Sequence, residues 1–258
     1  MGVSSGIYAT CIYSVNKAWY KKQPRSSFHF FNDLKEWEQI DKAGHLFTTF
    51  HESAIFASGL RWAGLNKRKA AIWGGLAGVL MQAPIEVMDG YSASYGASIS
   101  DFSTNLLGGV LFTGQYLIWD EIKITPKFSF HETRFAPARP NVLGSNFAER
   151  LLKDYNGQTY WLSFNVYSFI KQSNIPKWLN VSLGYGAEQM VSARRQINYQ
   201  LGYNTYRQYY LALDIDFTKI PTKKKWVSVV LNAINVLHFP GPALEVSKNQ
   251  IRIHGLYF

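Results

Sequence analysis

Eight polar residues on three apolar segments have the spacing to form one chemical site. Spacings of three, four or seven residues place the members of each segment on one face of a helix. Segment by segment, they are Asp41, His45 and Glu52, then Gln82, Glu86 and Asp89, then Asp101 and Asn105. Ionisable groups are costly to bury among apolar residues unless they pair or bind an ion. We therefore expect the three polar stripes to face one another inside a helical bundle.

A histidine with two carboxylates is an adequate ligand set for one divalent metal ion. We predict that His45, Glu86 and Asp101 would bind such an ion. The other polar residues would form hydrogen bonds behind the ligands or a structural network. These residues are Asp41, Lys42, Glu52, Gln82, Asp89 and Asn105.

The alternative is a buried network of hydrogen bonds and ion pairs, including Lys42, that only fixes helix packing. Asp101 would then be a first-turn residue near a helix cap at Ser98 or Ser100. The two interpretations differ in whether the side chains converge around a space for an ion or close on one another and Lys42.

Residues 37 to about 120 have the pattern of apolar helices. The first helix is expected over 37–65, closed by the lysine-rich stretch 66–69. Two uncharged runs follow, at 70–85 and 102–119, both interrupted by glycines. They approach the roughly 20 apolar residues that a membrane span needs. The sequence predicts an N-terminal bundle of three or four apolar helices, with an N-terminal arm, within residues 1–126.

From residue 127 the period changes to that of strands, and we expect an α+β fold with a C-terminal antiparallel sheet or partial barrel over 127–258. Strands are expected at 127–131, 160–165, 179–187, 208–217 and 250–258. One amphipathic helix, at 226–237, interrupts them. The Pro-Gly-Pro sequence at 240–242 predicts a rigid turn before the last strands.

The composition points to a membrane neighbour. Of 258 residues, 47% are hydrophobic and 16% aromatic, while only 17% are charged. Aromatic rings accumulate where apolar surfaces meet water, as at membrane interfaces. The net charge of +10 comes from dispersed lysines and arginines beside apolar segments. This placement suits membrane flanks better than a nucleic-acid groove, so no nucleic-acid partner is expected. The single cysteine, Cys11, excludes an internal disulfide.

The polar stripes also carry a resemblance to the VanZ-like pattern. That pattern consists, in order, of Asp41-Lys42-Ala43-Gly44-His45, Glu86, Asp89-Gly90, Ser98-x-Ser100-Asp101 and Asn105-x-x-Gly108. A longer match resembles an uncharacterised family of predicted periplasmic lipoproteins of the YfiM type. It adds Phe28-His29-Phe30-Phe31-Asn32-Asp33, the stretch 154–163 and Leu183-Gly184-Tyr185-Gly186. The resemblance implies a location in the bacterial envelope, at the outer membrane or its periplasmic face, and no established reaction. This sequence differs from a lipoprotein in one respect. No apolar segment precedes Cys11, so lipid attachment at this cysteine is not expected.

These observations favour a membrane-associated envelope protein that is an accessory or scaffold subunit of a larger outer-membrane complex, such as protein assembly or export machinery. Its partners would be membrane lipid and other envelope proteins. The alternative is a metal-dependent hydrolase or transferase acting on lipid or cell-wall intermediates. Transport along the polar stripes would need full membrane spans and ranks last.

Overall fold

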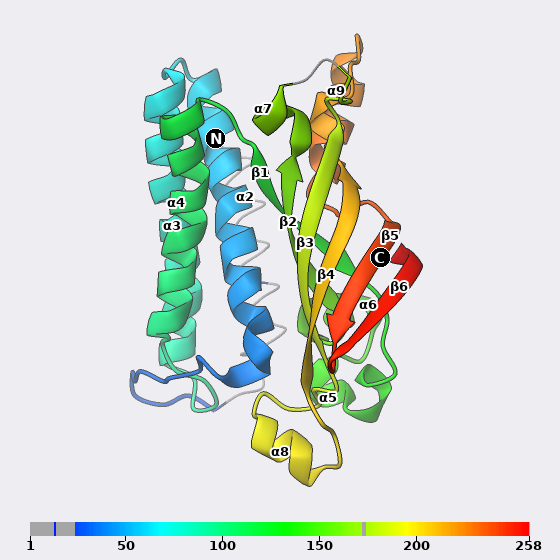
Figure 1. Ribbon diagram of the computed structural model, residues 1–258. Helices are drawn as coiled ribbons and strands as arrows, with labels where there is room; N and C mark the ends of the chain where they lie inside the picture. The colour runs from blue at the N-terminus through cyan, green and yellow to red at the C-terminus, as the bar shows by residue number, and fades with distance from the viewer. Residues whose placement is uncertain (1–12, 14–23, 172–173, 258) are drawn as a thin grey trace.

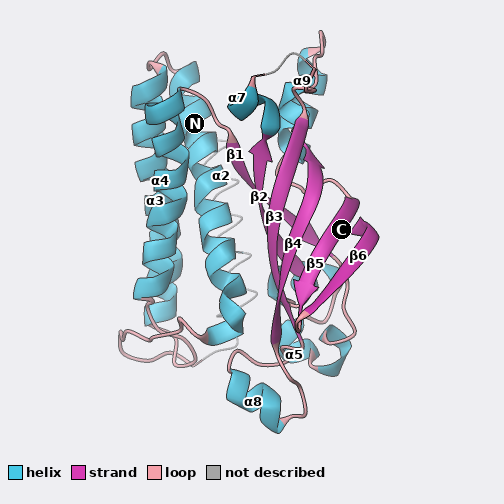
Figure 2. Cartoon of the chain, in the orientation of Figure 1, coloured by secondary structure: helices cyan, strands magenta, loops and turns pink. Residues whose placement is uncertain are grey.

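The computed structural model describes residues 13, 24–171 and 174–257 and has two layers, a helical bundle and an antiparallel sheet (Figure 1). Three long helices stand side by side, and six strands form a twisted sheet next to them (Figure 2). The α+β fold expected from the sequence is confirmed. The long helices are α2 (Ile40–Trp62), α3 (Lys67–Gly90) and α4 (Ile99–Trp119).

Asparagine and serine caps begin two of the long helices. The Asn66 side chain accepts a hydrogen bond from Lys69 N at the start of α3, and Ser98 accepts one from Asp101 N at the start of α4. Glycines then allow the helices to approach closely. A Cβ atom at Gly74 would lie 2.7 Å from Ala57 N of α2, and one at Gly108 would lie 2.6 Å from the Leu46 carbonyl.

The first helix begins later than the sequence suggests. Trp37, Glu38 and Gln39 have φ angles of 49°, 50° and 65°, so the backbone is left-handed there and α2 starts at Ile40. Glu38 is anchored by Arg195, whose Nη2 lies 2.6 Å from its Oε2, and by Thr205 Oγ1 at 2.7 Å. These contacts connect the start of the bundle to the C-terminal region, and they offset the energetic cost of the left-handed backbone at residues 37–39.

The sheet is a meander in which neighbouring strands are consecutive in sequence. Its strands are β1 (Ile124–Phe130), β2 (Gln158–Asn165), β3 (Leu179–Glu188), β4 (Tyr206–Ile215), β5 (Gly241–Ser247) and β6 (Gln250–Tyr257), hydrogen-bonded in that order. β1 and β6 are the two edges, so the sheet is open and the partial barrel is not formed. Phe128 of β1 exchanges two backbone hydrogen bonds with Val236 and His238, which covers part of that edge.

Two features of the C-terminal region differ from expectation. A turn was expected at 240–242, but Gly241 and Pro242 belong to β5. The strand tolerates Pro242 because the pairing with β6 is irregular at a bulge between Gly241 and Ala243. β1 begins at Ile124, ahead of the boundary expected at residue 127. The expected amphipathic helix is present as α9 (Lys225–Ile234). Shorter helices lie between the strands: α5 (Pro140–Leu143), α6 (Phe147–Lys153), α7 (Val166–Ile170) and α8 (Arg195–Gln200).

The two faces of the sheet have the reverse of the usual polarity. One registered row of aliphatic side chains crosses five strands on the outer face, each 37% to 80% exposed. The row consists of Leu162, Leu183, Leu211, Leu244 and Ile253. The opposite face is buried and largely polar. It holds an ion pair of 2.8 Å between Lys127 Nζ and Asp214 Oδ2, both fully buried, beside a small apolar cluster that contains Trp161 and Tyr210. In a soluble antiparallel sheet, the apolar face is normally the buried one.

The bundle packs against one end of this apolar face. Phe47 of α2 contacts Phe128 and Tyr160, with ring centroids 6.0 and 5.8 Å apart. α2 therefore lies beside the β1–β2 end of the sheet (Figure 1), and its first residue, Ile40, also packs in one core cluster with Tyr185 of β3. The aliphatic row from Leu183 to Ile253 is exposed. Within the described residues, α3 alone is long and apolar enough to cross a membrane, and 28% of its most apolar window is buried.

Candidate functional site

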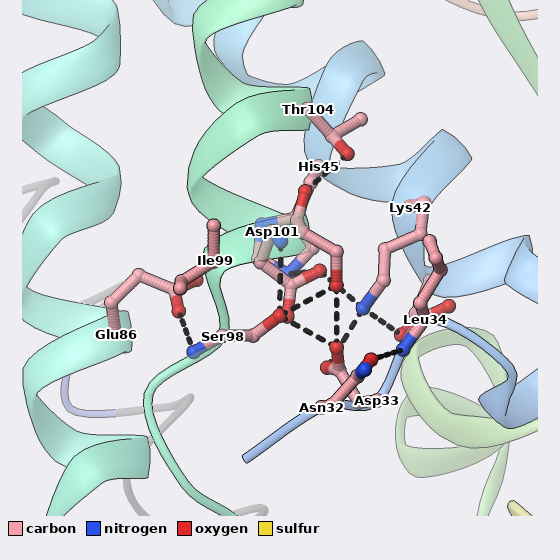
Figure 3. A network of polar contacts seen from close by, with 12 residues as sticks. Asn32, Asp33, Leu34, Lys42, His45, Glu86, Ser98, Ile99, Asp101 and Thr104 are labelled. Atoms are coloured by element: carbon pink, nitrogen blue, oxygen red, sulfur yellow. Dashed lines mark hydrogen bonds and ion pairs between the residues drawn. The ribbon is translucent and has the colours of Figure 1, made fainter. Parts of the chain in front are cut away.

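The three polar stripes meet at one end of the bundle, where α2 and α4 begin and α3 ends (Figure 3). His45 of α2, Glu86 of α3 and Asp101 of α4 each direct one ligand atom to this point, and the three atoms lie within 4.8 Å of one another. The structure thus brings together the three residues predicted as metal ligands. Their role as ligands stays a prediction.

His45 is oriented by an amide from α4. Its Nδ1 lies 3.0 Å from Asn105 Oδ1, which also accepts a hydrogen bond of 3.0 Å from Thr49 Oγ1. Because the amide oxygen only accepts, Nδ1 of His45 carries the proton in this arrangement. Nε2 is then the free ring nitrogen of the neutral form, and it lies 3.6 Å from Asp101 Oδ1.

Glu86 is buried with only half of its carboxylate paired. Its Oε2 accepts a hydrogen bond of 3.1 Å from Ser98 N. Its Oε1 is buried and has no hydrogen-bond partner among the residues that the structure describes. Burial raises the pKa of Glu86 to about 7, although the nearby His45 lowers it in part.

Asp101 is the capped first-turn residue expected in the alternative, and its side chain also enters the polar cluster. Its backbone N–H donates to Ser98 Oγ at 3.0 Å, which makes it the capped first-turn residue of α4. Its side chain points into the bundle, where Oδ1 lies 2.6 Å from Lys42 Nζ. Burial raises the pKa of Asp101, against the opposing charges of His45 and Lys42.

Lys42 is the centre of an ion-pair cluster beside the three candidate ligands. Its Nζ lies 2.7 Å from Asp33 Oδ2, 3.0 Å from Asp41 Oδ2 and 2.6 Å from Asp101 Oδ1. Burial opposes the charge on Lys42, but the carboxylates outweigh it and raise the pKa of the ammonium group. Burial also raises the pKa of Asp41, to about 6. The structural network expected as the alternative is therefore present alongside the triad.

Asp33 is the member of the site that the helical spacing missed. It precedes the bundle in an irregular segment, and its Oδ1 accepts hydrogen bonds of 2.6 Å from Ser98 Oγ and 2.7 Å from Ser100 Oγ. Burial alone would raise its pKa, but the hydrogen bonds from Lys42 and the two serines lower the pKa of Asp33 to about 2. Asp33 lies in the stretch Phe28–Asp33 that carried the family resemblance, which was the one signal for it in the sequence.

The remaining predicted residues lie further along the bundle. Gln82 Nε2 donates to Glu52 Oε2 at 2.7 Å, and Glu52 follows His45 by seven residues, about two turns along α2. Burial raises the pKa of Glu52 to about 7, against the hydrogen bond from Gln82. Asp89 follows Glu86 by three residues on α3 and is close enough for its charge to raise the pKa of Glu86.

Among the described residues, two groups of side chains have the geometry to hold a cation, and they differ in how the Lys42 ammonium group contacts them. The group of Asp33, Asp41 and Asp101 has the Lys42 ammonium group at its centre. In the group of His45, Glu86 and Asp101, the Lys42 ammonium group contacts Asp101 Oδ1 alone, and Glu86 Oε1 has no hydrogen-bond partner among the described residues. Chemically, this second group offers one neutral nitrogen and two carboxylates.

Comparison with known proteins gives one match, and it covers this site. Residues 29–117 match the model of a family described as "Predicted periplasmic lipoprotein (DUF2279)". The matched stretch contains Asp33 and all of the candidate ligands and ends within α4, so the sheet lies outside it. No curated protein and no solved structure matches the chain.

The match supports the resemblance to periplasmic lipoproteins, and it lends no support to the VanZ-like pattern. It agrees with the expected location in the cell envelope, on the periplasmic face of the outer membrane. Cys11 lies outside the described residues. The family description names no reaction.

Proposed function

We propose that this cell-envelope protein is a membrane-associated accessory or scaffold subunit of a larger outer-membrane complex. The observation that carries the proposal is the exposed aliphatic row from Leu162 to Ile253, set against a buried polar face. Apolar-outward and polar-inward alternation is the pattern of sheets that face lipid.

The bundle extends this apolar surface. α3 and α4 leave many large apolar side chains exposed, far more than single scattered residues. They include Trp73, Leu76, Leu80, Ile99, Phe102, Leu107, Val110 and Ile118. With a net charge of +10, the chain also suits an anionic lipid surface.

The unpaired edge strand β6 supports the proposal of a protein partner. No described segment pairs with the outer edge of β6, and both Ile251 and Ile253 on this strand are exposed. Within lipid, unpaired backbone N–H and C=O groups cost several kcal/mol each, so an open edge has to be covered. A strand or helix of a partner subunit would supply that cover.

The lipid contact is tested by vesicle flotation with charged variants. Ile253→Arg and Leu211→Arg place a charge on the apolar face, and Gln250→Arg places the same charge on the opposite face of β6. We use phosphatidylcholine vesicles in high salt, which suppresses binding by net charge alone. An arginine in lipid costs about 2–4 kcal/mol, so each apolar-face variant should lose at least tenfold in partitioning.

The Gln250→Arg variant should float like the wild type. Equal flotation of all three variants, or no flotation of the wild type, would refute the lipid contact. The subunit role is tested separately by purification from membranes in mild detergent and mass spectrometry of the intact assembly. A stoichiometric partner supports it, and a monodisperse single chain contradicts it.

A second candidate function is a metal-dependent hydrolase or transferase acting on lipid or cell-wall intermediates. The convergence of His45, Glu86 and Asp101 favours it, because a bound divalent ion polarises a scissile group and lowers the pKa of its water. Access is narrow, since the His45 side chain is 18% exposed and that of Asp101 7%. The accessory role is therefore the better supported of the two.

A further inference from the structure

We propose that His45, Glu86 and Asp101 bind one divalent first-row transition-metal ion, such as Zn²⁺ or Mn²⁺. This site is independent of the accessory role, since it lies inside the bundle and away from the apolar face of the sheet. The ion would join three helices at the end of the bundle where their polar stripes meet (Figure 3).

The geometry is close to that of a bound ion. Zn²⁺ has nitrogen and carboxylate oxygen ligands at about 2.0–2.2 Å in a tetrahedral arrangement, so two ligand atoms on one ion lie about 3.4 Å apart. The three donor atoms are within 4.8 Å of one another, and His45 Nε2 lies 3.6 Å from Asp101 Oδ1. Shortening any one of these distances by at most about 1.4 Å, through side-chain rotation, would complete the coordination.

Carboxylates outnumber cationic side chains at this end of the bundle. The Lys42 ammonium group lies within 3.0 Å of Asp33, Asp41 and Asp101, and among the described residues no ion pair joins it to Glu86. A divalent ion between His45, Glu86 and Asp101 would give the Glu86 carboxylate a cationic partner as well.

The unpaired oxygen of Glu86 is an independent sign of a missing partner. Glu86 is only 9% exposed, and its Oε1 has no hydrogen-bond partner within the described chain. Buried polar atoms in proteins are paired in the great majority of cases. Metal coordination would satisfy this oxygen without removing the Ser98 bond to Oε2.

His45 is held in the form that a metal requires. Asn105 fixes the proton on Nδ1 and leaves Nε2 facing the carboxylates, as the groups behind metal-bound histidines commonly do. The neighbouring carboxylate trio is different, because Lys42 already occupies its centre. The imidazole favours a transition metal over Ca²⁺ or Mg²⁺, which prefer oxygen ligands.

The test measures binding of the metal alone to the full chain, with any affinity tag removed. Protein stripped with a chelator is titrated with Zn²⁺ against a chromogenic competitor and with Mn²⁺ by electron paramagnetic resonance. Glu86→Gln removes a proposed ligand. Glu121→Gln makes the same change just beyond the far end of α4, at a residue paired with Lys123, and is the matched control.

We expect one ion per chain, at least tenfold weaker binding in Glu86→Gln, and less than threefold change in Glu121→Gln. His45→Asn should weaken binding similarly, and millimolar Ca²⁺ should not displace the ion. Metal should raise the melting temperature of the wild type and of Glu121→Gln but not of Glu86→Gln, which tests binding by a second measurement on the folded proteins. Absence of binding by the folded wild type, or equal binding by Glu86→Gln, would overturn the proposal.

Discussion

Replacing Lys42 by methionine tests the electrostatic account of the bundle end directly. The substitution keeps the apolar stem and removes the charge that contacts Asp33, Asp41 and Asp101 at 2.6 to 3.0 Å. The Lys42 side chain is 8% exposed, so water cannot replace the ammonium group without rearrangement. The carboxylates would be left buried without their shared counter-ion.

The size of the effect follows from that burial. Breaking a buried ion pair by removing one partner costs about 3–5 kcal/mol, because the remaining charge is uncompensated. For a chain of this length, about 1 kcal/mol corresponds to roughly 2–4 °C in melting temperature. We therefore expect Lys42→Met to melt about 6–20 °C below the wild type at pH 7.5. The deficit should shrink at pH 5, since carboxyl groups without a counter-ion regain ordinary or raised pKa values and take up protons.

The difference in melting temperature between Lys42→Met and the wild type is measured at both pH values by thermal unfolding in mild detergent, followed by circular dichroism. Lys35→Met is the control, because Lys35 is exposed and precedes the same helix. A melting temperature of Lys42→Met within 2 °C of the Lys35→Met control would refute the counter-ion role. So would a deficit that stays the same at pH 5, since it would point to lost packing rather than lost charge.

Two further predictions concern the bundle and the sheet. A Cβ at Gly78 would lie 2.8 Å from Ser53 N, so Gly78→Ala should lower the free energy of unfolding by about 1–3 kcal/mol through overpacking. No described atom lies within 4 Å of a Cβ at Gly114, so Gly114→Ala should raise the free energy of unfolding by up to about 1 kcal/mol. Equal unfolding midpoints of the two variants in urea would contradict the close packing at Gly78. His238 is buried against Trp161, and burial lowers its pKa from 6.5 to about 4. Between pH 4 and pH 6.5 the unfolded chain binds a proton at His238 that the folded chain does not. The contribution of His238 to stability is therefore complete above pH 6.5, and it falls by up to about 3 kcal/mol towards pH 4. His238→Phe should reduce the dependence of stability on pH in this range, and an unchanged dependence would contradict the role of His238.

The sequence alone predicted the features that depend on local periodicity. Spacings near 3.6 place His45 with Asp41, and Glu86 with Gln82, on single helix faces, whatever the helices pack against. The cost of burying such groups then requires the stripes to meet, and the structure brings them together. The change from helical to strand periodicity likewise predicted the α+β order of the chain. The sequence did not predict strand β5 at residues 241–247, because the Pro-Gly-Pro sequence at its start is typical of a turn.

Only the tertiary structure decided the features that depend on distant neighbours. Asp33 lies in an irregular segment without a period, so its place beside Lys42 follows from chain packing alone. The start of α2 was moved to Ile40 by contacts from Arg195 and Thr205, which come from the opposite half of the chain. Alternation along a strand separates two faces but does not say which is covered. Packing of the chain over the Lys127 face left the leucines outward, and that choice makes the apolar face available to lipid.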